Sequence, residues 1–282
     1  MSVCEKCGKQ LKQMSIWLGE KETRIQKKCS CMLAEEINES SIREQMDRSG
    51  KIERIYSSSS IKEYKHMQFD NFQVLSSSHE NLLRIARQYT LEFEQLRRQG
   101  KGFTICGDKG NGKTHIAAAI ANLLIREQLR NVIFENVPYL MLKIRSIYSP
   151  GANASGEKEI DLINRLCSSD LLILDDIGAC AWNGKDEERL YIIIDQCSTR
   201  KTPIIATTNL KSDGEMTEYL GNRAYSRLAA ANVALINTCP SYRETQIKQN
   251  MTFDGDWSKF SLEGSQEEGG RKAYGYRQST AK

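Results

Sequence analysis

The residues best suited to chemistry form the run Gly107-Asp-Lys-Gly-Asn-Gly-Lys113-Thr114. It matches G-x-x-x-x-G-K-[ST], a pattern in which backbone N–H groups and a helix N-terminus surround phosphate oxygens. Lys113 would contact the β- and γ-phosphates of ATP, and Thr114 would bind Mg²⁺. The alternative is a glycine-rich turn, but a predicted strand and a predicted helix flank the run. The residues predicted to contact the nucleotide are Gly107, Asp108, Lys109, Gly110, Asn111, Gly112, Lys113, Thr114 and His115.

Two carboxylates, Asp175 and Asp176, follow the apolar run of residues 171–174. A buried carboxylate without a partner is costly, and Mg²⁺ would supply the partner. Asp175 is predicted to hold the ion through water. Asp176 is predicted to orient and polarise the water that attacks the γ-phosphate. A plain turn after a strand is the alternative.

Polar residues farther along the chain could complete this site. Asn209 ends the next apolar run, where it could contact the γ-phosphate or the attacking water, or simply cap the strand. Arg227, and less directly Arg223, lie in Asn222-Arg-Ala-Tyr-Ser-Arg-Leu and could reach the nucleotide of a neighbouring subunit. Such an arginine acts only in an oligomer and therefore predicts self-association. A surface helix carrying two arginines is the alternative.

Four cysteines form two closely spaced pairs, Cys4-x-x-Cys7 and Cys29-x-Cys31. Two such pairs can close a tetrahedral Zn²⁺ site with four thiolates. Residues 11–26, between the pairs, alternate enough to form a small hairpin. A unit this small cannot bury much core, so a metal would explain its folding. Free structural thiols are the alternative.

Charge is unevenly distributed along the 282 residues. The chain has 40 Lys and Arg against 36 Asp and Glu, a net charge of +4, and residues 1–32 carry this whole excess. Four zinc-bound thiolates would reduce it, so the excess fits a docking module better than a DNA-binding surface. No apolar run is long enough for a membrane span, and the N-terminus lacks a secretory signal. We expect a cytoplasmic protein that does not bind membranes.

Apolar runs alternate with helical patterns through the middle of the chain. This alternation predicts a parallel sheet covered by helices on both faces, with polar site residues at the carboxyl ends of the strands. Strands are predicted at 102–106, 131–136, 171–176 and 203–209, and helices at 79–98, 114–129 and 137–148.

Changes in composition divide the chain into four parts. Residues 1–56 are predicted to be a zinc-binding and helical docking region, and residues 57–68 a polar linker. Residues 69–251 are predicted to form the α/β ATPase domain. Residues 252–282 are rich in glycine, serine and charge and are predicted to be a disordered tail.

Several motifs between Phe69 and Arg243, roughly 60% of the chain, resemble the DnaC/DnaI-type helicase loaders among the AAA+ ATPases. This branch is similar to the IstB-like transposition ATPases. His115, directly after the Lys-Thr pair, is characteristic of it. The other motifs are Phe-Asp-Asn-Phe, Leu-Leu-Ile-Leu-Asp-Asp-Ile-Gly, Ile-Ala-Thr-Thr-Asn-Leu, Asn-Arg-Ala-Tyr-Ser-Arg-Leu and Ser-Tyr-Arg.

The resemblance implies an AAA+ fold with a reduced or absent lid domain. It also implies an ATP-dependent protein that binds a hexameric, DnaB-type replicative helicase and places it on single-stranded DNA. Family helices that contact DNA match residues 138–148 here, with Lys143, Arg145 and Tyr148 as candidates. Basic and aromatic side chains suit phosphate contact and base stacking, although a solvated amphipathic helix is an equal alternative.

Two departures from the family pattern matter. Asp176 stands where a Glu is common, and its shorter side chain predicts slow ATP hydrolysis. Few residues follow Arg243 before the polar tail, which leaves open whether Arg243 replaces an arginine of the missing lid. Two other functions stay open: an ATPase that assists a DNA transposase, and an adaptor switched by ATP with negligible hydrolysis.

Overall fold

The computed structural model describes residues 3–11, 13–18, 21–26, 29–148, 158–180 and 184–243, without the side chains of 12–28 and 32–40. The chain divides into two units, Met1–Arg243 and Glu244–Lys282. The second unit, with the predicted tail at 252–282 and any lid after Arg243, lies outside the described residues.

Five parallel strands form the central sheet, in the order β4-β5-β6-β3-β7. Their carboxyl ends therefore lie along one edge. Four of the strands match the predicted ones, and β7 is an additional edge strand. The strands are β3 (Gly102–Gly107), β4 (Val132–Asn136), β5 (Leu171–Ile177), β6 (Ile204–Thr208) and β7 (Asn232–Asn237).

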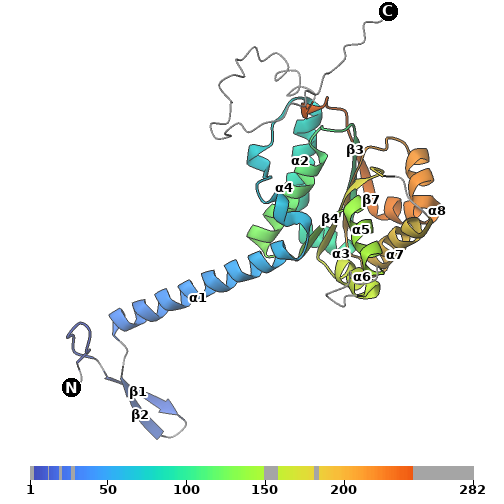
Figure 1. Cartoon of the computed structure of the whole chain (residues 1–282). Helices are drawn as coiled ribbons and strands as arrows, with labels where there is room; N and C mark the ends of the chain where they lie inside the picture. Colours follow the sequence, from blue (N-terminus) through green and yellow to red (C-terminus); the bar gives the residue numbers. More distant parts are fainter. Residues whose placement is uncertain are drawn as a thin grey trace, which may run out of the picture. The chain divides into compact units, whose positions relative to one another are not determined.

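Helices cover both faces of this sheet, and each face has its own apolar core. Figure 1 shows α2 and α4 on one side of the strands and α5 to α8 on the other. This arrangement confirms the predicted fold class. No helix among the described residues could cross a membrane. The helices are α2 (Ser77–Leu91), α3 (Phe93–Gln99), α4 (Lys113–Gln128), α5 (Val137–Ile147), α6 (Glu159–Cys167), α7 (Gly184–Arg200) and α8 (Asp213–Ala231).

The single helix predicted at 79–98 is two helices in the structure. Glu92 leaves the helical backbone region, with φ −94° and ψ 9°. Its carbonyl accepts the N–H groups of Gln95 and Leu96, at 3.0 and 3.1 Å, and so starts the next helix. The apolar stripe continues across the break, because Tyr89 and Phe93 are both buried. Apolar spacing alone therefore could not reveal it.

The N-terminal part contains the predicted hairpin and helix. Strands β1 (Gln13–Leu18) and β2 (Lys21–Gln26) pair antiparallel, and α1 spans Ser30–Ser57. The last turn of α1 buries Ile55 and Tyr56 in the same apolar core as α4. The end of α1 is therefore part of the packed domain.

Residues 57–68, predicted as a polar linker, contain the 3₁₀ helix η1 (Ser60–Tyr64) and lead into η2 (Phe69–Asn71). The Ser59 hydroxyl accepts the Phe134 N–H of β4 at 3.2 Å. The linker is thus hydrogen-bonded to the sheet. This contact could not be read from the serine-rich composition, which is equally typical of a free hinge.

Asn122 of α4 gives a test of this packing. Its side chain, 2% exposed, accepts the Tyr56 hydroxyl at 2.8 Å and donates to the carbonyls of Tyr64 and Met67 at 2.9 and 2.6 Å. Asn122→Ala should lower the free energy of unfolding by about 2–4 kcal/mol, because these groups lose their partner. Urea denaturation measures this. Glu127→Ala, exposed on the same helix, should change it by less than about 0.5 kcal/mol; equal losses would contradict the prediction.

Candidate functional site

A pocket of about 620 Å³ lies at the carboxyl edge of the sheet. We call it the edge pocket. The loop of residues 109–112 and the start of α4 form its floor, and the ends of β4, β5 and β6 form one side. Its volume is within the range of small-ligand sites. Five residues of the segment 64–73 also line the pocket, as do Tyr242 and Arg243, and none of these was among the residues predicted to contact the nucleotide.

The glycines of the phosphate-loop motif are required by its backbone. Gly110 and Gly112 have φ of 80° and 88°, a region that side chains other than glycine rarely adopt. A Cβ at Gly110 would lie 2.3 Å from the Ser241 hydroxyl oxygen, and one at Gly112 would lie 2.6 Å from the Phe72 ring. The loop is therefore closely packed on both sides, and α4 begins directly after it at Lys113.

Lys113 is 7% exposed and lies within this loop. Its Nζ donates to the carbonyls of Gly107 and Asp108 at 2.8 and 2.6 Å, and to Asn209 Oδ1 at 3.0 Å. Burial lowers the pKa of Lys113, and the nearby Asp176 carboxylate opposes that shift. Phosphate oxygens entering the loop could replace these carbonyl contacts and stabilise the ammonium more strongly.

Asp175 and Thr114, the predicted magnesium ligands, are in direct contact. Thr114 Oγ1 donates to Asp175 Oδ1 at 3.0 Å, and Thr207 Oγ1 donates to the same oxygen at 2.6 Å. Burial of Asp175 raises the pKa of its carboxyl, and the two hydroxyl donors oppose that shift. A cation beside this carboxylate would favour its charged form. The pair therefore fits the donor set of a magnesium site.

An irregularity in β5 changes the backbone direction at Asp176. The register between β5 and β6 shifts between Leu174 and Ile177, and Asp176 has a φ of 66°. Its N–H donates to Thr207 Oγ1 at 2.9 Å, and Asn209 Nδ2 donates to its Oδ1 at 3.2 Å. The structure thus brings together the predicted Asp176 and Asn209. Sequence patterns did not predict the bulge that orients them.

Two residues that are distant in sequence fix the backbone of the phosphate loop through hydrogen bonds. The Asn111 carbonyl accepts His79 Nε2–H at 2.9 Å and Asn237 Nδ2 at 2.8 Å. The Leu75 N–H donates to His79 Nδ1, which leaves the ring proton on Nε2. Both lone pairs of this buried carbonyl are therefore satisfied. No local sequence motif predicted that His79 or Asn237 would be part of the site.

Phe72 forms the wall beside the loop. Its ring meets those of His79 and His115 edge-on, with centroids 4.9 and 5.2 Å apart. His115 Nε2–H donates to the Gln68 carbonyl at 2.9 Å. Burial lowers the pKa of His115, so the ring is neutral near pH 7. The geometry thus connects His115 to the lining of the pocket.

The three candidate arginines lie in different places. Arg243 lines the edge pocket, next to Tyr242, whose N–H donates to the Gly110 carbonyl at 3.0 Å. Arg227 pairs with Asp195 at 3.2 Å on the surface of α8. Arg223 lines a separate cavity between α7 and α8. Among the described residues that line the edge pocket, Arg243 is the only arginine.

The four N-terminal cysteines come together, with all Sγ atoms within 4.8 Å of one another. The Cys4–Cys31 and Cys7–Cys29 pairs are 3.5 and 3.4 Å apart. Four thiolates about 2.3 Å from one zinc ion would lie about 3.8 Å from each other. The Cys31 N–H and neighbouring thiols lower the pKa of Cys29 to about 6. The donor set fits a tetrahedral metal site.

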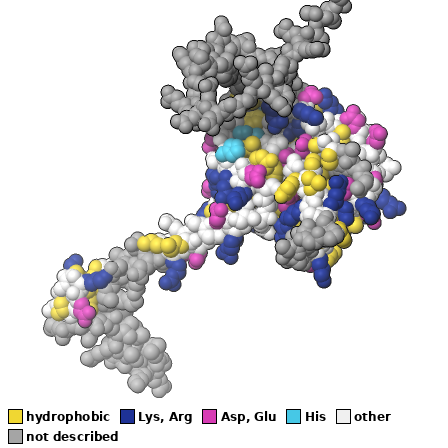
Figure 2. All heavy atoms as spheres, viewed as in Figure 1, with side chains coloured by type: hydrophobic (Ala, Val, Ile, Leu, Met, Phe, Trp, Pro, Cys, Tyr) yellow, Lys and Arg dark blue, Asp and Glu magenta, His cyan; other side chains and the backbone are white. Residues whose placement is uncertain are grey.

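Two of the three DNA-contact candidates are engaged within the protein. Arg145 Nε donates to Asp186 at 3.1 Å, and Asp186 is fully buried. The Tyr148 hydroxyl donates to Glu159. Lys143 is half-buried on α5. Figure 2 shows basic and acidic side chains interspersed on the visible face of the α/β part. The DNA contacts stay a prediction.

Comparison with known proteins assigns the chain to a family. Residues 10–231 match the model of the IstB-like ATP binding protein family. The replicative helicase loader DnaC of Escherichia coli K12 is 32% identical over 203 residues, which cover 71% of this chain and 79% of DnaC. The loader DnaC of Buchnera aphidicola from Acyrthosiphon pisum is 30% identical, over 69% of this chain and 76% of the relative.

Solved structures share the fold. The crystal structure of the DnaC helicase loader aligns with a TM-score of 0.56 and 22% identity, over 63% of this chain and 99% of that one. The structure of DnaI aligns with a TM-score of 0.51 and 20% identity, over 64% and 92%. These structural similarities support the α/β fold. The family assignment rests on the match of the family model to residues 10–231. The chain belongs to the family of IstB-like ATP-binding proteins.

Proposed function

We propose that this protein is an ATP-dependent loader of a hexameric, DnaB-type replicative helicase. The single observation that carries the proposal is the likeness to DnaC, a replicative helicase loader, over 79% of that relative's length. The edge pocket supports the ATP dependence, because it collects the loop, Lys113 and the two carboxylates at one edge of the sheet. In this proposal the helicase is placed on single-stranded DNA.

The residues of the edge pocket divide the chemistry among them. Loop N–H groups and the N-terminus of α4 bind the phosphates, and Lys113 stabilises their charge. Thr114 and Asp175 would hold Mg²⁺, which would supply positive charge beside the bound phosphates. Asp176 orients the attacking water and accepts its proton, while Asn209 fixes the Asp176 carboxylate through the 3.2 Å hydrogen bond. The short Asp side chain favours slow turnover.

Self-association would complete this site. Arg227 is 57% exposed at its side chain and pairs with Asp195. A surface ion pair of this kind contributes little stability, so Arg227 can exchange it for a phosphate of a neighbouring subunit. Arg243 lines the pocket of its own subunit. Arg227 is therefore our candidate for the arginine in trans.

The cysteine cluster is proposed as a zinc site within the helicase-docking region at residues 1–56. Its support is the packing of four sulfur atoms within 4.8 Å, close to the spacing of a four-thiolate site. Zinc would fix the chain ends of the hairpin and the start of α1. Its role there is structural, since four protein ligands leave no open position.

ATP hydrolysis tests the site. Lys113→Ala should weaken ATP binding about 10- to 100-fold, because a charge-assisted contact is lost. Asp176→Asn should retain binding but lower kcat about 10²- to 10⁴-fold. Phosphate release and nucleotide affinity separate the two effects. Lys51→Ala, on the exposed surface of α1, is the control. Hydrolysis by Lys113→Ala at the wild-type rate, with DNA present, would leave only the adaptor function.

Metal analysis tests the cysteine cluster. The purified protein should contain about one Zn²⁺ per chain, and Cys4→Ser with Cys29→Ser should remove it. Cys180→Ser, outside the cluster, should retain it. The double variant should bind nucleotide normally and lose helicase binding, because the edge pocket is built from other residues. Full zinc retention in the double variant would refute the site.

Co-purification distinguishes the two DNA-related functions. The protein, mixed with a hexameric replicative helicase and ATP, should co-elute with it in size-exclusion chromatography. Because the proposed loading depends on ATP, omission of ATP should change the amount of helicase that is bound. Binding to a DNA transposase, with no binding to the helicase, would instead support the transposition function of IstB-like relatives.

A further inference from the structure

The linker at residues 57–68 crosses α4, the helix that starts at the phosphate loop. Three polar side chains of α4 lie at spacings of seven and four residues and so share one face of the helix. All three bind backbone carbonyls of the linker. The bonds run from Asn122 to Tyr64 and Met67 at 2.9 and 2.6 Å, from Arg126 to Lys65 at 2.9 Å, and from His115 to Gln68 at 2.9 Å.

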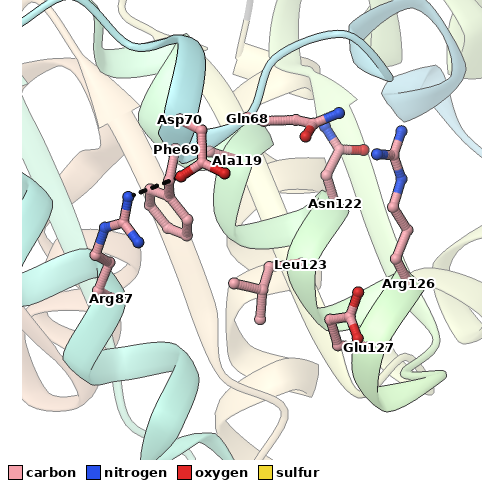
Figure 3. A pocket seen from close by; sticks show the side chains of 9 residues that line it. All are labelled: Gln68, Phe69, Asp70, Arg87, Ala119, Asn122, Leu123, Arg126 and Glu127. Atoms are coloured by element: carbon pink, nitrogen blue, oxygen red, sulfur yellow. Dashed lines mark hydrogen bonds and ion pairs between the residues drawn. The ribbon is translucent and has the colours of Figure 1, made fainter.

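The same face of α4 also holds the end of α1. The Tyr56 hydroxyl donates to Asn122 Oδ1 at 2.8 Å and accepts Arg126 Nε–H at 3.1 Å. In Figure 3 the side chains of Gln68, Asn122 and Arg126 lie together beside the cavity between α2 and α4. Asn122 and Arg126 therefore bind both the linker and the last turn of α1, through different atoms of the same side chains.

Tyr64, at the end of η1, brings this linker into the edge pocket. Its ring packs on Phe134 of β4 with a centroid distance of 5.1 Å. It lines the pocket together with Thr114, Asp175 and Asp176, the residues at the predicted γ-phosphate end. Burial and these carboxylates raise the pKa of Tyr64, so its hydroxyl stays a proton donor. Among the described residues this hydroxyl has no hydrogen-bond partner.

We propose that Tyr64 senses the nucleotide: its hydroxyl donates a hydrogen bond to a γ-phosphate oxygen of bound ATP and thereby fixes the linker and the end of α1. This inference rests on the proposed function, because it requires ATP in the edge pocket. ADP has no γ-phosphate and would leave Tyr64 without this acceptor. The N-terminal docking region would then receive the nucleotide state through α1.

Tyr64→Phe, which removes only the hydroxyl, tests the contact. Calorimetry would measure the affinities for ADP and for a non-hydrolysable ATP analogue, each with Mg²⁺. The variant should bind the ATP analogue about 3- to 10-fold more weakly and ADP as wild type does, because one hydrogen bond is lost. Tyr139→Phe, an exposed tyrosine of α5 outside the edge pocket, should bind both ligands normally.

Hydrogen exchange tests the coupling. In the wild type, the ATP analogue should slow amide exchange in residues 57–68 and in the last turns of α1 more than ADP does. Tyr64→Phe should abolish this difference while both ligands are saturating. A purely structural role of the tyrosine would change exchange equally with either nucleotide.

The outcomes separate this inference from the proposed function. A wild type that binds neither nucleotide overturns the proposed function, and the inference with it. A wild type that binds both, beside a Tyr64→Phe variant with an unchanged ratio of ATP-analogue to ADP affinity, overturns the inference alone. Equal linker exchange with both nucleotides in the wild type has the same consequence.

Discussion

Two opposite charges buried at the carboxyl edge of the sheet constrain the rest of the structure. Lys113 and Asp175 are 7% and 3% exposed, and a charge removed from water is stable only with close partners. Those partners come from a loop, a helix and the ends of two strands, as the contacts of Lys113 with Asn209 and of Asp175 with Thr207 show. Parallel strands place their carboxyl ends side by side, so residues from several strands can lie close enough to serve as partners of these two charges.

The phosphate loop must also keep one shape without a strand or helix of its own. Its backbone is held by groups that approach from outside, such as His79 and Asn237 on the Asn111 carbonyl. Glycine at 110 and 112 permits the approach of Ser241 and Phe72. Segments on either side of the α/β domain thus converge on the loop. A change in the loop backbone on phosphate binding would therefore alter its contacts with residues 72–79 and 237–242.

The sequence predicted the parts of this site that depend on local order. Short sequence motifs contain the loop, the two carboxylates of β5 and Asn209. Each motif consists of the end of one strand and the residues that follow it directly. His79 and Tyr64 belong to no such motif, and they meet the site only through tertiary packing, His79 on Asn111 and Tyr64 on Phe134. The break at Glu92 was invisible for a related reason: the apolar stripe runs through it unchanged. Short-range patterns record burial and turns, whereas long-range pairing requires the assembled sheet.

The linker illustrates how composition can mislead about mechanical behaviour. Its serines suggest a free hinge, yet its backbone carbonyls are hydrogen-bonded to Asn122 and Arg126 of α4. Contacts to carbonyls do not depend on linker side chains, so a polar, low-complexity sequence can still be firmly placed. Because α4 starts at Lys113, the helix that follows the phosphate loop and the helix that contacts the linker are one continuous element. A signal between the edge pocket and α1 then needs no separate moving part: it needs only a group, such as Tyr64, whose contacts differ between ATP and ADP.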